Sequence, residues 1–83
     1  MLKMEEIFNR VKDVLSNKYD GTVLDKNVAY ELGITPTALA TQKNRNLLPF
    51  MALTEFCLRY KVNINWLFYN IGTKELDYAK ENM

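Results

Sequence analysis

Hydrophobic residues in the first part of the chain recur at steps of three and four, which is the spacing of an amphipathic helix. Glu5 and Glu6 suit the positive N-terminal end of such a helix. An Asp-Gly pair at 20–21 then predicts a turn over residues 17–22. We expect a first helix over about 3–16, with an inward stripe of Met4, Ile7, Phe8, Val11, Val14 and Leu15.

A second helix is expected from residue 24 or 25 to Leu32, with Val28 and Ala29 on its inner side. Its start has two interpretations. Asp25 caps the helix directly, or Thr22 and Asp25 form a capping-box pair one turn earlier. Gly33 follows the helix, where a left-handed backbone is easiest for glycine.

A third helix is predicted to begin at Pro36 and to continue to Asn44 or Arg45. Thr35 is a good N-cap, and proline fits the first helical position because its missing N–H has no partner there.

Two further helices complete the pattern. Pro49 opens a fourth helix to about Lys61, with apolar positions at Met51, Leu53, Phe56, Cys57 and Tyr60. Asn63 caps a fifth helix from Ile64 to about Tyr69, and Gly72 ends it. No segment alternates like a strand, so we predict an all-α, five-helix domain over 1–72. The polar C-terminal tail, 73–83, is expected to fray.

Composition narrows the class of protein. The chain has 83 residues, a net charge of +1, no histidine and one cysteine. A zinc site and a Ser/His or Cys/His pair therefore cannot be assembled, and no glycine-rich phosphate loop is present. We expect no enzyme, no metal, no cofactor and no small-molecule substrate.

The distribution of apolar and charged residues bears on location and partner. No apolar run is long enough to span a bilayer, and acids stand where a signal peptide has its apolar stretch, so a cytoplasmic protein is expected. The segment between Glu31 and Glu55 contains no acidic residue, but it contains the basic residues Lys43 and Arg45. A polyanion is best tolerated at this part of the chain.

The middle of the chain has the residue spacing of a helix-turn-helix. Two steeply crossing helices need a small side chain at the crossing, and Ala29 provides it. Four residues later the turn needs an unhindered backbone, and Gly33 provides that. With Asp25 as position one of a twenty-residue unit, the scaffold residues fall at positions four, five, eight, nine, ten and fifteen: Val28, Ala29, Leu32, Gly33, Ile34 and Leu39.

The same geometry predicts a DNA-binding face. The side chains expected to face the major groove are Thr35, Pro36, Thr37, Ala40, Thr41 and Asn44. Thr37 and Thr41 can hydrogen-bond to bases or pack on a thymine methyl, and Asn44 can pair with adenine or bind phosphate. Phosphate contacts are expected from Lys26, Lys43, Arg45 and Asn46. Arg45 has an alternative role in stabilising the C-terminus of the third helix.

Three segments of the chain resemble the DNA-binding domain of the phage CI-type repressors, which has the lambda-repressor-like fold. They read DKNVAYELGITPTAL at 25–39, RNLLPF at 45–50 and VNINWLFYNIG at 62–72. The resemblance implies a lambda-repressor-like five-helix bundle that acts as a bacterial or phage-encoded transcriptional regulator. It further implies sequence-specific binding to double-stranded DNA, more often as a repressor than as an activator, by a homodimer on a palindromic operator.

Gln42 departs from the family pattern, which often has tryptophan or an aliphatic residue at position eighteen of the unit. The amide either loosens the packing or points toward DNA or a neighbouring helix. Many members also have a C-terminal oligomerisation or self-cleaving domain, and the chain is either an excised domain or a free-standing regulator.

Residues near the end of the chain divide between core and surface. Cys57 is expected to be a buried thiol, and Trp66 to dock the fifth helix. A short helix cannot bury aromatics on every side, so a dimer interface is predicted at Phe68, Tyr69 and Ile71. The competing hypothesis is a protein-interaction adaptor or assembly module, which the low net charge permits.

Overall fold

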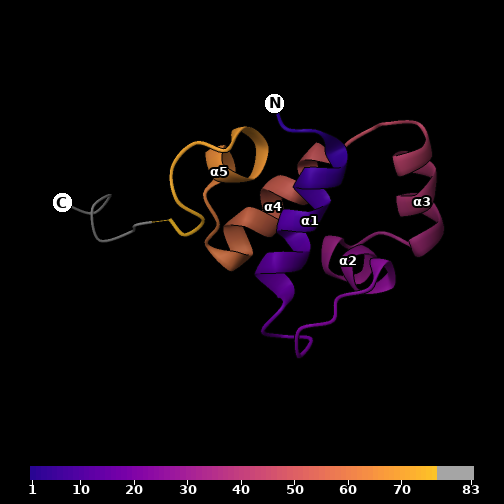
Figure 1. The fold of residues 1–83 in the computed structure, drawn as a ribbon. Coiled ribbons are helices and arrows are strands. Elements are labelled where there is room, and N and C mark those ends of the chain that lie inside the picture. The colour runs from indigo at the N-terminus through magenta and orange to yellow at the C-terminus, as the bar shows by residue number, and fades with distance from the viewer. Residues whose placement is uncertain (77–83) are drawn as a thin grey trace.

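Helix α1 (Met4–Leu15) runs through the middle of the molecule, with its predicted apolar face buried (Figure 1). The computed structural model describes residues 1–76, which contain five helices. The others are α2 (Asp25–Leu32), α3 (Pro36–Asn44), α4 (Phe50–Tyr60) and α5 (Ile64–Tyr69). The predicted all-α, five-helix domain is confirmed. Within residues 1–76, no helix has the length and hydrophobicity needed to cross a membrane.

All five helices contribute side chains to one core. Its fully buried side chains include Ile7 and Val11 of α1, Val28 of α2, Phe56 of α4 and Leu67 of α5. Figure 1 shows α5 on one side of α1, with α2 and α3 on the other. Helix α3 is the outermost helix on its side, which leaves one of its faces open to solvent.

Local sequence signals place the starts of α3 and α5 correctly. The Thr35 hydroxyl accepts a hydrogen bond from the Ala38 backbone N–H at 3.0 Å, and Pro36 is the first residue of α3. Asn63 caps α5 through its side-chain oxygen, which accepts from the Asn65 N–H at 2.9 Å. These caps satisfy helix N–H groups that have no partner inside the helix.

Helix α2 starts at Asp25, as expected, but its cap differs from both interpretations of the sequence. Leu24 is the N-cap residue, and its N–H donates to the Asn27 side-chain oxygen at 2.9 Å. Asp25 is the first helical residue, and its carboxylate contacts two lysines instead of capping the helix. Both predicted caps, Asp25 alone and the Thr22–Asp25 pair, were wrong. The lysines that bind the Asp25 carboxylate come from α1 and α3, and a local sequence pattern does not show such contacts.

Two details of α4 and α5 also differ from the prediction. Met51 was expected to be an inward residue of α4, but it is 79% exposed. The buried face is set by Leu53, Phe56 and Cys57, and Met51 lies outside that stripe. Helix α5 ends at a left-handed Asn70, two residues before the glycine expected to end it.

The first residues of the predicted tail are packed against the loop before α5. The Asn63 N–H donates to the Lys74 carbonyl at 2.8 Å, and the Leu76 N–H donates to the Lys61 carbonyl at 3.0 Å. The Lys74 ammonium also lies 3.2 Å from the Asp13 carboxylate of α1. Segment 73–76, which was expected to fray, is thus held in place, and the rest of the predicted tail, 77–83, lies outside the described residues.

Candidate nucleic-acid interface

The predicted helix-turn-helix scaffold is present. Ala29 is fully buried, and Gly33 has φ 72°, the left-handed conformation expected for it. The turn is closed by the Ile34 N–H, which donates to the Ala29 carbonyl at 3.0 Å. The apolar scaffold residues Val28, Leu32 and Leu39 are buried, and Ile34 is partly buried against the core. Helix α3 is therefore held against α2 by the side chains that the sequence identified.

The outer face of α3 consists of small and polar side chains. The six residues expected to face the groove are all exposed: Thr35, Pro36, Thr37, Ala40, Thr41 and Asn44. Thr37, Thr41 and Asn44 are spaced by four and three residues, so they form one row along the helix. The Thr35 hydroxyl is used in capping α3, where it accepts a hydrogen bond from the helix. The hydroxyl groups of the exposed row are therefore those of Thr37 and Thr41.

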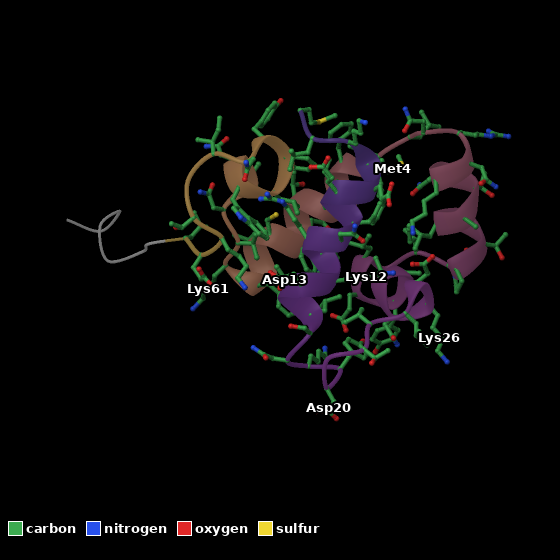
Figure 2. All side chains as sticks on the ribbon, viewed as in Figure 1. Met4, Lys12, Asp13, Asp20, Lys26 and Lys61 are labelled. Carbon is green, nitrogen blue, oxygen red and sulfur yellow. The ribbon has the colours of Figure 1, made fainter. Side chains whose placement is uncertain are left out.

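The residues expected to contact phosphate divide into two groups. Lys26, Arg45 and Asn46 are exposed at the edges of the α2–α3 unit, and Figure 2 shows Lys26 projecting outward from α2. Asn46 has a left-handed backbone, and Arg45 is the C-cap residue of α3. Lys43 differs, because its ammonium lies 3.1 Å from the Asp25 carboxylate and 5.0 Å from the centre of the Phe8 ring. Lys43 is therefore turned toward α1 and α2, away from the exposed row.

Asp25 joins three helices. Its carboxylate lies 2.9 Å from the Lys12 ammonium of α1 as well as contacting Lys43 of α3. Hydrogen bonds from Lys12 and Lys43 hold the pKa of Asp25 below its usual value, although partial burial acts in the opposite sense. The sequence did not predict this cluster, because its members lie 13 and 18 positions apart.

Gln42 lies on the inner side of α3. Its side chain is partly buried, and its Oε1 atom is buried without a hydrogen-bond partner in the part of the chain that the structure describes. A buried amide oxygen is not directed at DNA, so the structure leaves looser packing or an amide that points toward a neighbouring helix. An unpaired buried carbonyl oxygen is unfavourable for the folded state.

The buried carboxylate of Glu31 connects α2 to α4 and to the loop between α1 and α2. Glu31 is 8% exposed, and its carboxylate accepts hydrogen bonds from the hydroxyls of Tyr19 and Tyr60 and lies 3.0 Å from the Lys18 ammonium. Burial alone raises the pKa of Glu31. The hydrogen bonds from Tyr60, Tyr19 and Lys18 outweigh burial and bring the pKa below its usual value. Arg59 of α4 also donates to the Glu31 backbone carbonyl.

The predicted dimer surface is only partly exposed. Phe68 is 4% exposed, and its ring centre lies 5.7 Å from that of Phe50, so its assignment to a surface was wrong. The core has room for Phe68 because α4 and the N-terminal segment cover it; the Leu2 N–H donates to the Phe68 carbonyl. Tyr69 and Ile71 are exposed as predicted.

Trp66 and Cys57 behave as core residues. Trp66 is partly buried beneath the Arg10 guanidinium, which lies 4.5 Å from the ring centre and donates to the Trp66 carbonyl at 2.7 Å. This contact docks α5 onto α1. Cys57 is buried, and burial raises the pKa of its thiol to about 11, which keeps it protonated and unreactive at neutral pH.

Comparison of the chain with protein-family models, with curated proteins and with solved structures finds no match. Among residues 1–76, no group of three or more potential ligand side chains is arranged to hold a metal ion. The site is therefore defined by its own geometry, which is a helix-turn-helix with an exposed row of small polar side chains.

Proposed function

We propose that the chain is a sequence-specific DNA-binding transcriptional regulator that places α3 in the major groove. The observation that carries this proposal is the exposed row of Thr37, Thr41 and Asn44 on a helix anchored by Ala29 and Gly33. Small hydroxyl and amide side chains allow close approach to base edges and form hydrogen bonds with them.

The charge around the row supports the same proposal. Residues 32–54, which include all of α3, contain no acidic side chain, so no carboxylate on this segment repels phosphate. Lys26 and Arg45 are exposed on either side and suit contacts to the DNA backbone. The role of repressor, the palindromic operator and the homodimer come from the resemblance to phage CI-type repressors. In that arrangement two half-sites lie about 34 Å apart.

One observation favours the alternative of a protein-interaction adaptor or assembly module. Met51 and Leu58 lie two helical turns apart on the outer face of α4 and are both exposed. Exposed apolar side chains on one helix face are typical of protein contacts. This surface and the α3 row belong to different helices, so variants can separate the two functions.

Selection from a random DNA pool, followed by affinity measurements from low to moderate salt, tests the proposal. An enriched palindrome is expected. Thr41→Ala should change the preferred base at one position of each half-site, and Thr54→Ala, an exposed threonine on α4, is the matched control. Lys26→Gln should weaken all sequences alike and reduce the salt slope by about one. Lys61→Gln, on the opposite side of the molecule in Figure 2, should not. No enriched motif and a flat salt dependence would favour the adaptor.

A further inference from the structure

A hollow of about 310 Å³ lies between α1 and the C-terminal end of α3. Helix α1 supplies one wall, and residues at and just beyond the end of α3 supply the other. Figure 2 shows Met4 and Lys12 of α1 near opposite ends of the wall that faces α3. The lining residues are Met4, Glu5, Phe8, Asn9, Lys12, Lys43 and Asn46.

The hollow exists because the inner side of α3 changes character along its length. Leu39 is apolar and buried, but the next residues on the inner side are the partly buried, polar Gln42 and Lys43, and the exposed Asn46 follows the end of the helix. Lys43 lies over the Phe8 ring, with its ammonium 5.0 Å from the ring centre, and leaves the space beside Met4 open.

Two lysines lie at one end of the hollow, and Met4 and the acidic Glu5 lie about two helical turns away from Lys12 along α1. Lys12 and Lys43 reach the hollow from different helices, and both ammoniums contact the Asp25 carboxylate. The Asp25 side chain is 57% exposed, so these ion pairs are weak and readily exchanged. Met4 supplies most of the accessible apolar lining, because Phe8 is only 3% exposed. A carboxylate on a ligand can therefore take the place of the Asp25 carboxylate, with its apolar body against Met4.

We propose that this hollow binds a small planar aromatic carboxylate, whose carboxylate contacts Lys12 and Lys43 and whose ring lies against Met4. The volume is at the lower end of the range for ligand sites, about 300–1,000 Å³, which restricts the ligand to one or two rings. The amides of Asn9 and Asn46 are placed to hydrogen-bond to polar substituents on the ring.

Binding at this site acts on α3. The ligand draws Lys43 away from Asp25, the first residue of α2, and so removes an ion pair between the two helices of the helix-turn-helix. This part of the proposal rests on the proposed function: the ligand lowers affinity for DNA, and by linkage DNA lowers affinity for the ligand by the same factor.

The test uses the full chain without DNA, titrated with benzoate and 2-naphthoate and observed by two-dimensional NMR of the backbone amides. Benzamide and 2-naphthamide are the neutral controls of matching shape. Saturable shifts are expected at Met4, Lys12, Lys43 and Asn46, with the carboxylates binding about fivefold tighter than the amides. No saturation up to about 10 mM, or equal binding of carboxylate and amide, would overturn the site.

Variants that change the charge around the hollow are expected to change the affinity for 2-naphthoate in opposite directions. Lys12→Gln and Lys43→Gln should each weaken 2-naphthoate binding by about fivefold, and Lys26→Gln is the control because Lys26 does not line the hollow. Asp25→Asn should tighten binding, because it removes the competing carboxylate. Changes of the same sign in Asp25→Asn and Lys43→Gln would contradict the proposal, and circular dichroism confirms that each variant is folded.

DNA binding forms a separate arm. If 2-naphthoate binds but leaves DNA affinity unchanged, the regulatory part is wrong and the ligand site stands. If the protein binds no DNA sequence selectively in the absence of ligand, the proposed function fails, and the NMR titration still decides the ligand site on its own.

Discussion

The Lys43 ammonium lies 3.1 Å from the Asp25 carboxylate and thereby ties the inner side of α3 to the first residue of α2. The same carboxylate lies 2.9 Å from the Lys12 ammonium of α1. Next to this cluster, Gln42 occupies a position where a large apolar side chain would join α3 to the core. Beyond Leu39, the contacts of α3 with α1 and α2 are thus mainly polar, and we expect the C-terminal half of α3 to be the least firmly packed part of the candidate interface.

Replacing Gln42 with leucine is expected to stabilise the protein. The substitution removes the unpaired buried Oε1 and fills the same space with apolar atoms, so the free energy of unfolding should rise by about 1–2 kcal/mol. Urea denaturation followed by circular dichroism measures this change. Gln42→Ala is the control, because it removes the amide without filling the space and should gain less than leucine. A loss of stability in Gln42→Leu would show that the amide makes a favourable contact in solution.

Glu31→Gln is expected to destabilise the protein at neutral pH by about 2–3 kcal/mol, because it weakens the hydrogen bonds from Tyr19 and Tyr60 and the contact with Lys18. The folded-state pKa of Glu31 is lowered, so its contribution is present above the pKa of the unfolded state and is lost as pH falls through the folded-state pKa. The stability difference between wild type and Glu31→Gln should therefore shrink below about pH 4.

Urea midpoints measured at several pH values between neutrality and pH 3 test this dependence. Glu55→Gln, an exposed acid on α4, is the matched control and should change stability little at any pH. A difference between wild type and Glu31→Gln that stays constant as the pH falls would contradict the assigned role of the carboxylate.

How much of this site the sequence predicts depends on how local each contact is. The Thr35 cap, the proline at Pro36 and the left-handed Gly33 act within one turn, so short-range rules placed them correctly. The exposed row follows from the same helix start, because a correct start fixes which side chains face outward. Local signals therefore determined both the helix-turn-helix and the side of α3 that is open.

The features that the sequence did not predict have a common physical cause, which is a partner distant in sequence. Lys43 is turned inward by Asp25, which lies 18 positions earlier. Glu31 is buried because Tyr19, Tyr60 and Lys18 satisfy its carboxylate, and Phe68 is buried because α4 and the N-terminal segment cover it. A helical pattern gives the face on which a side chain lies, but not which groups from other helices meet it.

Gly33→Ala is expected to destabilise the protein by about 1–2 kcal/mol through backbone strain alone. The residue has φ 72°, and an added Cβ would meet no atom within 4 Å, so there is no steric clash to add to the cost. Thermal unfolding gives the size of the loss. Gly33→Asn should lose less, because asparagine tolerates the left-handed conformation better than alanine does. Equal losses in the two variants would indicate a cause other than the backbone conformation.

The remaining prediction concerns the dimer, for which Tyr69 and Ile71 are the exposed residues of the proposed surface. Isolated exposed apolar side chains are ordinary, but two neighbours at the end of α5 suit a symmetric contact between copies of the chain. The wild-type protein is expected to form dimers at micromolar concentration, as measured by analytical ultracentrifugation. Ile71→Asp should shift it to monomer, because the contact would bury an unpaired carboxylate.

Leu58→Asp provides the matched control, since Leu58 is an equally exposed apolar residue on α4 and lies outside the proposed surface. Dissociation by Leu58→Asp but not by Ile71→Asp would move the interface to α4. A wild-type protein that stays monomeric alone and binds DNA half-sites without cooperativity would remove the dimer from the proposed function. The contact of α3 with a single half-site would remain to be tested by the DNA selection.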